Sequence, residues 1–128
     1  MKNLTAQWVR KAEADLAAAD QLFRLKPPLT DPACFHCQQA AEKYLKAMLC
    51  EQGLPVPKIH LLTDLLNRLL PVDATLAALR PRVVRLSRFA VDYRYPGIHV
   101  SSRQATTALK SATQVREEIR QRLGLRTR

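Results

Sequence analysis

Residues 31–52 read DPACFHCQQAAEKYLKAMLCEQ, and this stretch decides the fold because its apolar residues follow the helical repeat. Asp31 followed by Pro32 is typical of a helix start with Asp31 as the N-cap residue, and Gly53 is typical of a helix end. At about 100° per residue, one broad face is apolar and the opposite face is polar. The apolar face consists of Cys37, Ala40, Ala41, Tyr44, Leu45 and Met48. The polar face consists of Gln39, Glu42, Lys43 and Lys46, with His36 at its edge. Because small alanines let another helix approach closely, we predict that this helix lies centrally.

The rest of the chain shows the same periodicity, in segments that prolines separate. No segment alternates apolar and polar residues for long enough to predict a strand. We therefore predict one all-α domain over residues 1–128, an up-and-down bundle of four long helices plus one short helix. Its hydrophobic helix faces exceed what one thin bundle needs, so a homodimer is expected. Besides 31–52, the predicted helices are 5–25, 61–70, 73 or 81 to 94, and 101 or 102 to 123.

The formal net charge of +10 lies almost entirely in the C-terminal part of the chain. Residues 1–79 contain nine Lys and Arg against eight Asp and Glu, whereas residues 80–128 contain twelve against three. Such a localised positive field predicts a polyanion or an acidic protein as the partner. The alternative is a basic surface that binds no ligand.

Composition also restricts the compartment and the cofactors. No apolar run approaches the roughly 20 residues that span a bilayer, and the first ten residues lack the pattern of a secretory signal. We expect a cytoplasmic protein without membrane contact, whose three cysteines are free thiols. Cys34 and Cys37 lack a second Cys/His pair at a usable spacing, so they are predicted to be small buried residues. No metal and no cofactor is expected.

Arg94 and His99 are the candidate catalytic residues, because they flank the turn-forming sequence Tyr95-Pro96-Gly97. A permanent cation and a group that exchanges protons near neutral pH lie together here, and RNA cleavage without a metal needs both. Arg94 also falls on the apolar side of its predicted helix. An arginine there is costly unless it faces a carboxylate, a wet cleft or an interface.

Phosphate or RNA binding is predicted for further basic residues. Arg85 and Arg88 share the polar side of their predicted helix, and Arg103 follows in the same basic half of the chain. On the central helix, His36 and Lys43 are also candidates for phosphate contact. The alternative for His36 is a structural hydrogen bond at the boundary between the two helix faces.

Three elements together resemble the HEPN domain family. They are residues 35–47 (FHCQQAAEKYLKA), 57–61 (PKIHL) and 92–97 (DYRYPG), which occur in the order and spacing of that family. The resemblance covers Trp8 to about Leu123 and implies an α-helical bundle that commonly dimerises. Many members are metal-independent endoribonucleases whose Arg-x4–6-His motif lines a cleft at the dimer interface. The matching residues here are Arg94 and His99.

The resemblance also implies a biological setting. Small stand-alone HEPN proteins often act as toxins that are paired with a minimal nucleotidyltransferase antitoxin. Toxins that are silenced by nucleotidylation carry a tyrosine two residues after the histidine, where this chain has Ser101. Three interpretations of the Arg94–His99 segment stay open. It cleaves RNA, or it belongs to a non-catalytic module that binds nucleotides, nucleic acid or a protein, or it is only a turn between two helices.

Overall fold

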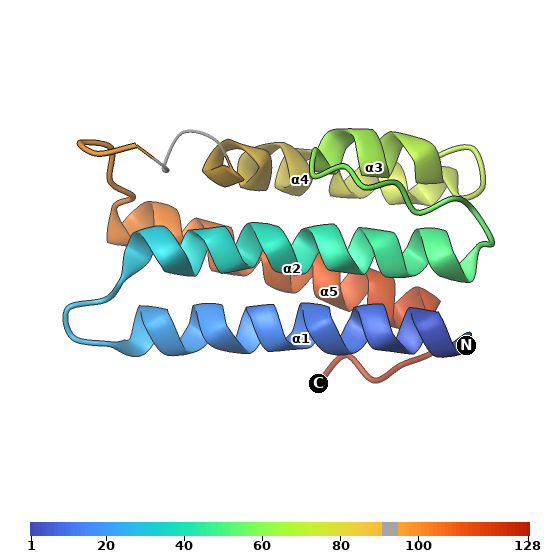
Figure 1. Cartoon of the computed structure of the whole chain (residues 1–128), viewed down its shortest axis with the longest axis horizontal. Helices are drawn as coiled ribbons and strands as arrows, with labels where there is room; N and C mark the ends of the chain where they lie inside the picture. Colours follow the sequence, from blue (N-terminus) through green and yellow to red (C-terminus); the bar gives the residue numbers. More distant parts are fainter. Residues whose placement is uncertain (91–94) are drawn as a thin grey trace.

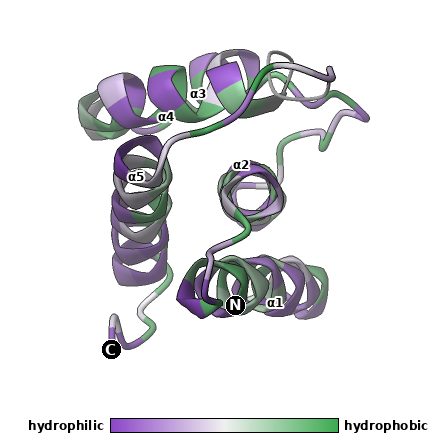
Figure 2. Ribbon diagram, turned by 90° about the vertical axis from the view of Figure 1, so that its left-hand side faces the viewer, coloured by the Kyte–Doolittle hydropathy of each residue, from purple (hydrophilic) through white to green (hydrophobic). Residues whose placement is uncertain are grey.

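A single helix, α2, lies at the centre of the molecule, as Figure 2 shows by looking along its axis. The computed structural model describes residues 1–90 and 95–128. α1 packs antiparallel to α2, α5 lies along a second side, and the layer of α3 and α4 covers a third side (Figure 1). The predicted all-α bundle is confirmed. The α-helices are α1 (Asn3–Arg24), α2 (Thr30–Glu51), α3 (Leu62–Leu69), α4 (Arg80–Ser87) and α5 (Ser102–Arg122).

Short 3-10 turns lengthen α4 at both ends. They span Ala74–Leu79 and Arg88–Ala90, so that residues 74–90 form one continuous helical segment. The carboxylate of Asp73 begins this segment by accepting a hydrogen bond from the backbone N–H of Thr75 at 3.1 Å. The fourth long helix of the predicted bundle is therefore a composite segment, and its predicted end at residue 94 lies outside the described residues.

The apolar face predicted for α2 is confirmed. All six of its predicted members are buried, with Ala40 and Ala41 at 0% exposure, and Ala47, which was not among the six, is also fully buried. Because an alanine side chain extends only one carbon from the backbone, α1, α5 and α3 can each approach α2 closely. These alanines therefore suit α2 to the middle of the bundle.

The polar face predicted for α2 is wrong at two positions, because Glu42 and Lys46 are 3% and 5% exposed. Their charges pair with each other at 3.1 Å, the carboxylate of Glu42 lies 3.1 Å from His60 Nδ1, and Lys46 Nζ lies 5.6 Å from the ring of Trp8. A buried ion pair is tolerated only when further polar contacts compensate its desolvation. The loop that follows α2 and the start of α1 supply those contacts, and periodicity along α2 does not reveal them.

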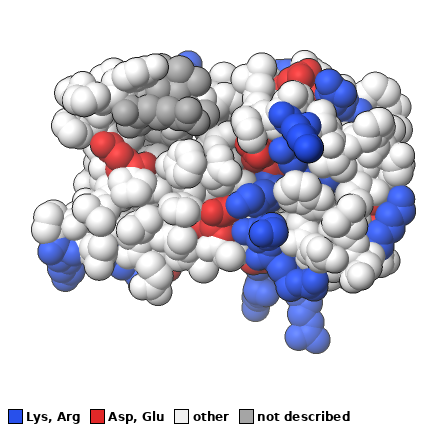
Figure 3. Space-filling model, in the orientation of Figure 1, with Lys and Arg blue, Asp and Glu red and all other residues white. Residues whose placement is uncertain are grey.

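Part of the C-terminal positive charge is neutralised within the fold. Arg116 and Arg120 of α5 bind the carboxylate of Glu13 in α1, at 3.0 and 2.8 Å. Arg122 binds Asp73 at 2.9 Å and so ties the end of α5 to the segment before α4. On the opposite side of the bundle, over α1 and α2, Lys and Arg also lie beside Asp and Glu (Figure 3). Net charge along the sequence therefore does not show which surface is positively charged.

Cys34 and Cys37 are buried in the core, as predicted, with exposures of 0% and 1%. Burial raises the pKa of both thiols to about 12. Since a thiol loses its proton only near its pKa, about one in ten thousand of these groups is the reactive thiolate at about pH 8. We expect iodoacetamide to leave both cysteines unmodified in the native protein and to alkylate them in urea, as measured by peptide mass spectrometry. Native alkylation at the rate of a free cysteine would contradict this packing.

No helix within residues 1–90 and 95–128 is both long enough and apolar enough to cross a bilayer.

Candidate nucleic-acid site

A tight turn precedes His99 and determines the path of the chain there. The backbone N–H of Ile98 donates to the carbonyl of Tyr95 at 3.3 Å, with Pro96 and Gly97 at the two central positions. Gly97 has a φ of +88°, which the second central position of a type II turn requires and which residues with a Cβ rarely adopt. Proline preforms the first central position. The turn predicted from Tyr95-Pro96-Gly97 is therefore present.

Two side chains from the start of α2 hold the residue after His99. Asp31 Oδ1 accepts a hydrogen bond from the backbone N–H of Val100 at 2.7 Å, and Thr30 Oγ1 donates to the carbonyl of Val100 at 2.7 Å. The side chain of Val100 is itself buried at 4% exposure. These contacts join segments about 70 residues apart and attach the end of the turn to the bundle.

The prediction that Asp31 is the N-cap of α2 is wrong. The helix begins at Thr30 and the N-cap position is Leu29, which makes no side-chain capping bond. Asp31 lies in the first helical turn, and its carboxylate reaches across to residues 99 and 100.

The last helix, by contrast, is capped as predicted, by Ser101 or Ser102. Ser101 forms a capping box with Gln104 at the start of α5.

We call the two hydrogen bonds from Thr30 and Asp31 to the backbone of Val100 the clamp. His99 lies between the turn and this clamp, and its side chain is 78% exposed. Its Nδ1 lies 3.3 Å from Asp31 Oδ2, so one ring nitrogen faces the protein while most of the ring contacts solvent. Such a ring is accessible to a ligand and is oriented by a carboxylate. Arg94, its predicted catalytic partner, lies outside the described residues.

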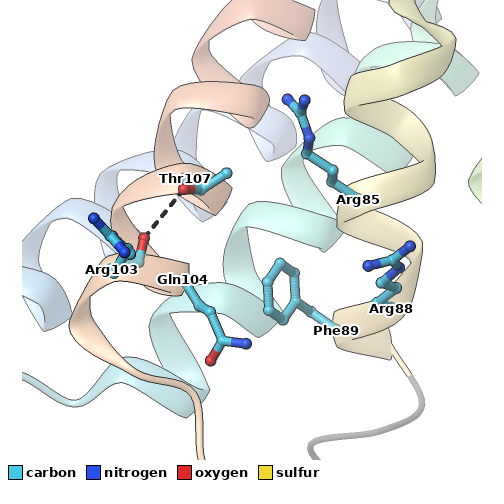
Figure 4. A pocket seen from close by; sticks show the side chains of 6 residues that line it. All are labelled: Arg85, Arg88, Phe89, Arg103, Gln104 and Thr107. Atoms are coloured by element: carbon cyan, nitrogen blue, oxygen red, sulfur yellow. Dashed lines mark hydrogen bonds between the residues drawn. The ribbon is translucent and has the colours of Figure 1, made fainter.

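A cleft of about 300 Å³ lies between α4 and α5 (Figure 4). It lies at the end of the bundle where residues 95–101 lead into α5 (Figure 1). Arg85 and Arg88 project from α4 and the 3-10 turn after it, and Arg103 projects from the first turn of α5. The ring of Phe89 points between the two helices. Gln104 and Thr107 complete the lining. All three arginines for which phosphate binding is predicted thus line one cleft, with the guanidinium of Arg103 on the side of α5 away from the other two (Figure 4). We name these six residues the arginine cleft.

No acidic residue lines the arginine cleft, and Arg85, Arg88 and Arg103 have no acidic partner within the described part of the chain. Two other hollows of comparable size, about 300 and 260 Å³, are lined by acids as well as by arginine. Like charges that gather without a counter-charge repel one another, and a bound anion removes that repulsion. Of these three hollows, the arginine cleft is thus the one that no acidic residue of the described part of the chain lines.

His36 and Lys43, the other two predicted phosphate contacts, converge on a carboxylate of the protein itself. Asp15 of α1 lies 2.8 Å from His36 Nδ1 and also binds Lys43 Nζ. All three side chains lie between α1 and α2, on a different side of α2 from the layer that contains α4. The structure thus separates this pair from the arginine cleft and joins it to the packing of α1 on α2.

Residues that sequence reasoning does not select also belong to this end of the molecule. Phe89, Gln104 and Thr107 line the arginine cleft, and Thr30 and Asp31 hold the segment that carries His99. The sequence gives little indication of these residues, since an aromatic residue next to an arginine and two polar residues before a proline occur in many helical proteins.

Among the described residues, no three His, Cys, Asp or Glu side chains form a group that could hold a metal ion.

Comparison with known proteins identifies one family. The family model of the HEPN domain matches residues 5–122, which is nearly the whole chain. No curated protein and no solved structure matches the chain significantly.

Proposed function

Since the chain belongs to the HEPN domain family, we propose that it is a metal-independent endoribonuclease with Arg94 and His99 as its catalytic residues. The observation that carries the proposal is the placement of His99. Its ring is exposed at the end of the bundle, a carboxylate contacts one ring nitrogen, and the arginine cleft opens at the same end of the molecule.

The proposed reaction is an internal transfer at a ribose. His99 removes the proton from a 2′-hydroxyl, the 2′-oxygen forms a bond to the adjacent phosphorus, and the bond from phosphorus to the 5′-oxygen breaks. The guanidinium of Arg94 stabilises the negative charge that builds up on the phosphate oxygens. In a homodimer, His99 of the partner subunit donates the proton that the leaving 5′-oxygen needs. The products are a 2′,3′-cyclic phosphate and a 5′-hydroxyl.

The arginine cleft supplies the binding energy in this proposal. Its three arginines contact phosphates on the strand next to the cleaved bond, and their forked donors suit phosphate oxygens. His36 and Lys43 have no part in this contact, because Asp15 already holds both of them.

The proposed biological role is that of a toxin. HEPN proteins often pair with a nucleotidyltransferase, and a partner of that kind would act here as the antitoxin. Ser101 stands at the position where modified toxins carry a tyrosine, and its hydroxyl accepts a hydrogen bond from Gln104 N–H at 3.1 Å in the cap of α5. We therefore propose that the antitoxin silences the protein by covering the His99 end of the bundle.

A second candidate function is a non-catalytic module that binds nucleotides, RNA or an acidic protein. The arginine cleft favours it, because no acidic residue within residues 1–90 and 95–128 lines that cleft and phosphate binding needs no proton transfer. The two functions differ in their dependence on His99. A binding module keeps its full activity without the imidazole, whereas the nuclease loses turnover.

The test is cleavage of RNA in excess EDTA. The purified protein is incubated with total RNA and then with defined single-stranded oligomers taken from the cut sites. We expect cleavage that persists in EDTA, 2′,3′-cyclic phosphate ends in the mass spectrum, and no cut where a single 2′-deoxynucleotide replaces the ribose. Cleavage at the 2′-deoxy position would refute the mechanism, and binding without any cleavage would favour the second function.

A further inference from the structure

We infer that Asp31 is the positioning residue of His99, which holds the imidazole as the Nδ1–H tautomer and leaves Nε2 as its basic nitrogen. The inference starts from how the two oxygens of one carboxylate are used. Oδ1 accepts from the backbone N–H of Val100 at 2.7 Å, and Oδ2 lies 3.3 Å from His99 Nδ1. The bond to the backbone fixes the plane of the carboxylate, so that the second oxygen is directed at the ring.

Burial supports the same assignment. The side chain of Asp31 is 32% exposed and that of His99 is 78% exposed, so the carboxylate lies on the protein side of the ring and the rest of the ring faces outward. An ionised carboxylate only accepts hydrogen bonds, and it therefore selects the tautomer in which Nδ1 carries the proton. The lone pair of the neutral ring then resides on Nε2, on the side away from Asp31.

A role in capping α2 does not account for these contacts. Asp31 lies inside the first turn, where a negative charge favours the helix, but both of its oxygens contact residues 99 and 100 instead of serving as the cap. His60 offers an instructive contrast within the same chain. Its Nδ1 also meets a carboxylate, yet that carboxylate belongs to Glu42, which already binds Lys46 in the core. Within residues 1–90 and 95–128, Asp31 pairs with no second cation in this way.

The consequence for catalysis rests on the proposed function, whereas the tautomer itself does not. If His99 removes the 2′-hydroxyl proton, it does so through Nε2, and Asp31 stabilises the imidazolium that results. Asp31 does not touch RNA in this account. It raises the fraction of His99 that has the correct tautomer and orientation, so its loss lowers kcat and leaves KM almost unchanged.

The experiment compares Asp31→Asn with the native protein by long-range 1H–15N spectroscopy of 15N-histidine-labelled protein, at about pH 8 where histidine is mostly neutral. In the variant, the amide oxygen can keep the bond to Val100 N–H while the amide nitrogen donates to His99 Nδ1. We expect the native protein to show the Nδ1–H tautomer at His99 and the variant to show the Nε2–H tautomer. We also expect kcat for RNA cleavage to fall by about 100-fold, because a wrong tautomer disables the base.

Thr30→Val is the matched control. It removes the hydroxyl that donates to the carbonyl of Val100, and so weakens the same clamp without touching His99. We expect it to keep the Nδ1–H tautomer and to retain activity within about threefold, since it removes one neutral hydrogen bond. Equal losses of kcat in Thr30→Val and Asp31→Asn would show that Asp31 only holds the backbone, and would overturn the inference.

The two proposals fail in distinguishable ways. An Nε2–H tautomer in the native protein, or no change of tautomer in Asp31→Asn, overturns the positioning role whatever the activity is. A tautomer that switches as expected in a protein that cleaves no RNA supports the positioning role and refutes the nuclease.

Should Asp31→Asn unfold, Asp31→Glu provides the readout. It retains a carboxylate acceptor beside the ring, so the Nδ1–H tautomer should persist in a variant with native helical circular dichroism. An Nε2–H tautomer in that folded variant would show that a carboxylate here does not select the tautomer, and would overturn the inference.

Discussion

Replacing His99 by alanine is expected to reduce RNA cleavage by about 1,000-fold, within the range that general acid–base catalysis contributes. The variant lacks both the base that removes the 2′-hydroxyl proton and, in a homodimer, the acid that protonates the leaving oxygen. The fold should persist, because the imidazole is 78% exposed and its contact with Asp31 is a partly exposed pair. Such pairs contribute about 1 kcal/mol or less to the free energy of unfolding. Single-turnover cleavage rates and thermal melts measure the two effects.

His60→Ala is the matched control for this variant. The side chain of His60 is 75% exposed and its Nδ1 contacts a carboxylate, as in His99, although that carboxylate is the buried Glu42. We expect it to cleave RNA at the native rate. Equal activity of the His60 and His99 variants would mean that no imidazole takes part in the reaction, and only the binding function would remain.

Arg94, the second catalytic residue of the proposed mechanism, is tested by a separate variant. Arg94→Ala is expected to lower the cleavage rate by about 100-fold or more, because the negative charge at the phosphate is no longer stabilised. Unchanged cleavage by both Arg94→Ala and His99→Ala would discard the proposed mechanism.

Reversing two charges of the arginine cleft, as Arg85→Glu with Arg88→Glu, is expected to weaken RNA binding by about 100-fold. Each arginine contributes a charge-assisted hydrogen bond of about 1.5–3 kcal/mol to a phosphate, and this double variant also introduces repulsion. The logarithm of the binding constant should also depend less steeply on the logarithm of the salt concentration, by about one unit for each phosphate that the variant no longer binds. Fluorescence anisotropy with an all-2′-deoxy oligomer measures binding without cleavage.

The control is a protein with the same net charge. Arg24→Glu with Arg68→Glu changes two exposed arginines that each lie four residues from an aspartate on their own helix. If the localised field of the cleft holds the strand, this control binds nearly as tightly as the native protein. Should both double variants lose the same affinity, net charge alone would explain binding, and the arginine cleft would have no special role.

The helical segments and the apolar face of α2 follow from the sequence alone. The helical repeat predicts the buried face of α2, and the structure confirms it at every predicted position. The serine cap of α5, predicted at Ser101 or Ser102 and found at Ser101, and the turn at Tyr95-Pro96-Gly97 are confirmed in the same way. These features depend on contacts within a few residues of one another, where helical periodicity, capping and the restricted backbone of proline act directly.

Burial of Glu42 and Lys46, the contact of Asp31 with His99 and the arginine cleft were decided only by the tertiary structure. Each of them joins segments that are distant in the sequence: the loop after α2 with α1, the start of α2 with residues 99–100, and α4 with α5. Periodicity specifies which side of a helix is apolar, but not which other helix lies against its edge or how the two are rotated. Those quantities arise when the side chains of all the helices pack together, because the least costly packing is a property of the whole core and not of any one segment.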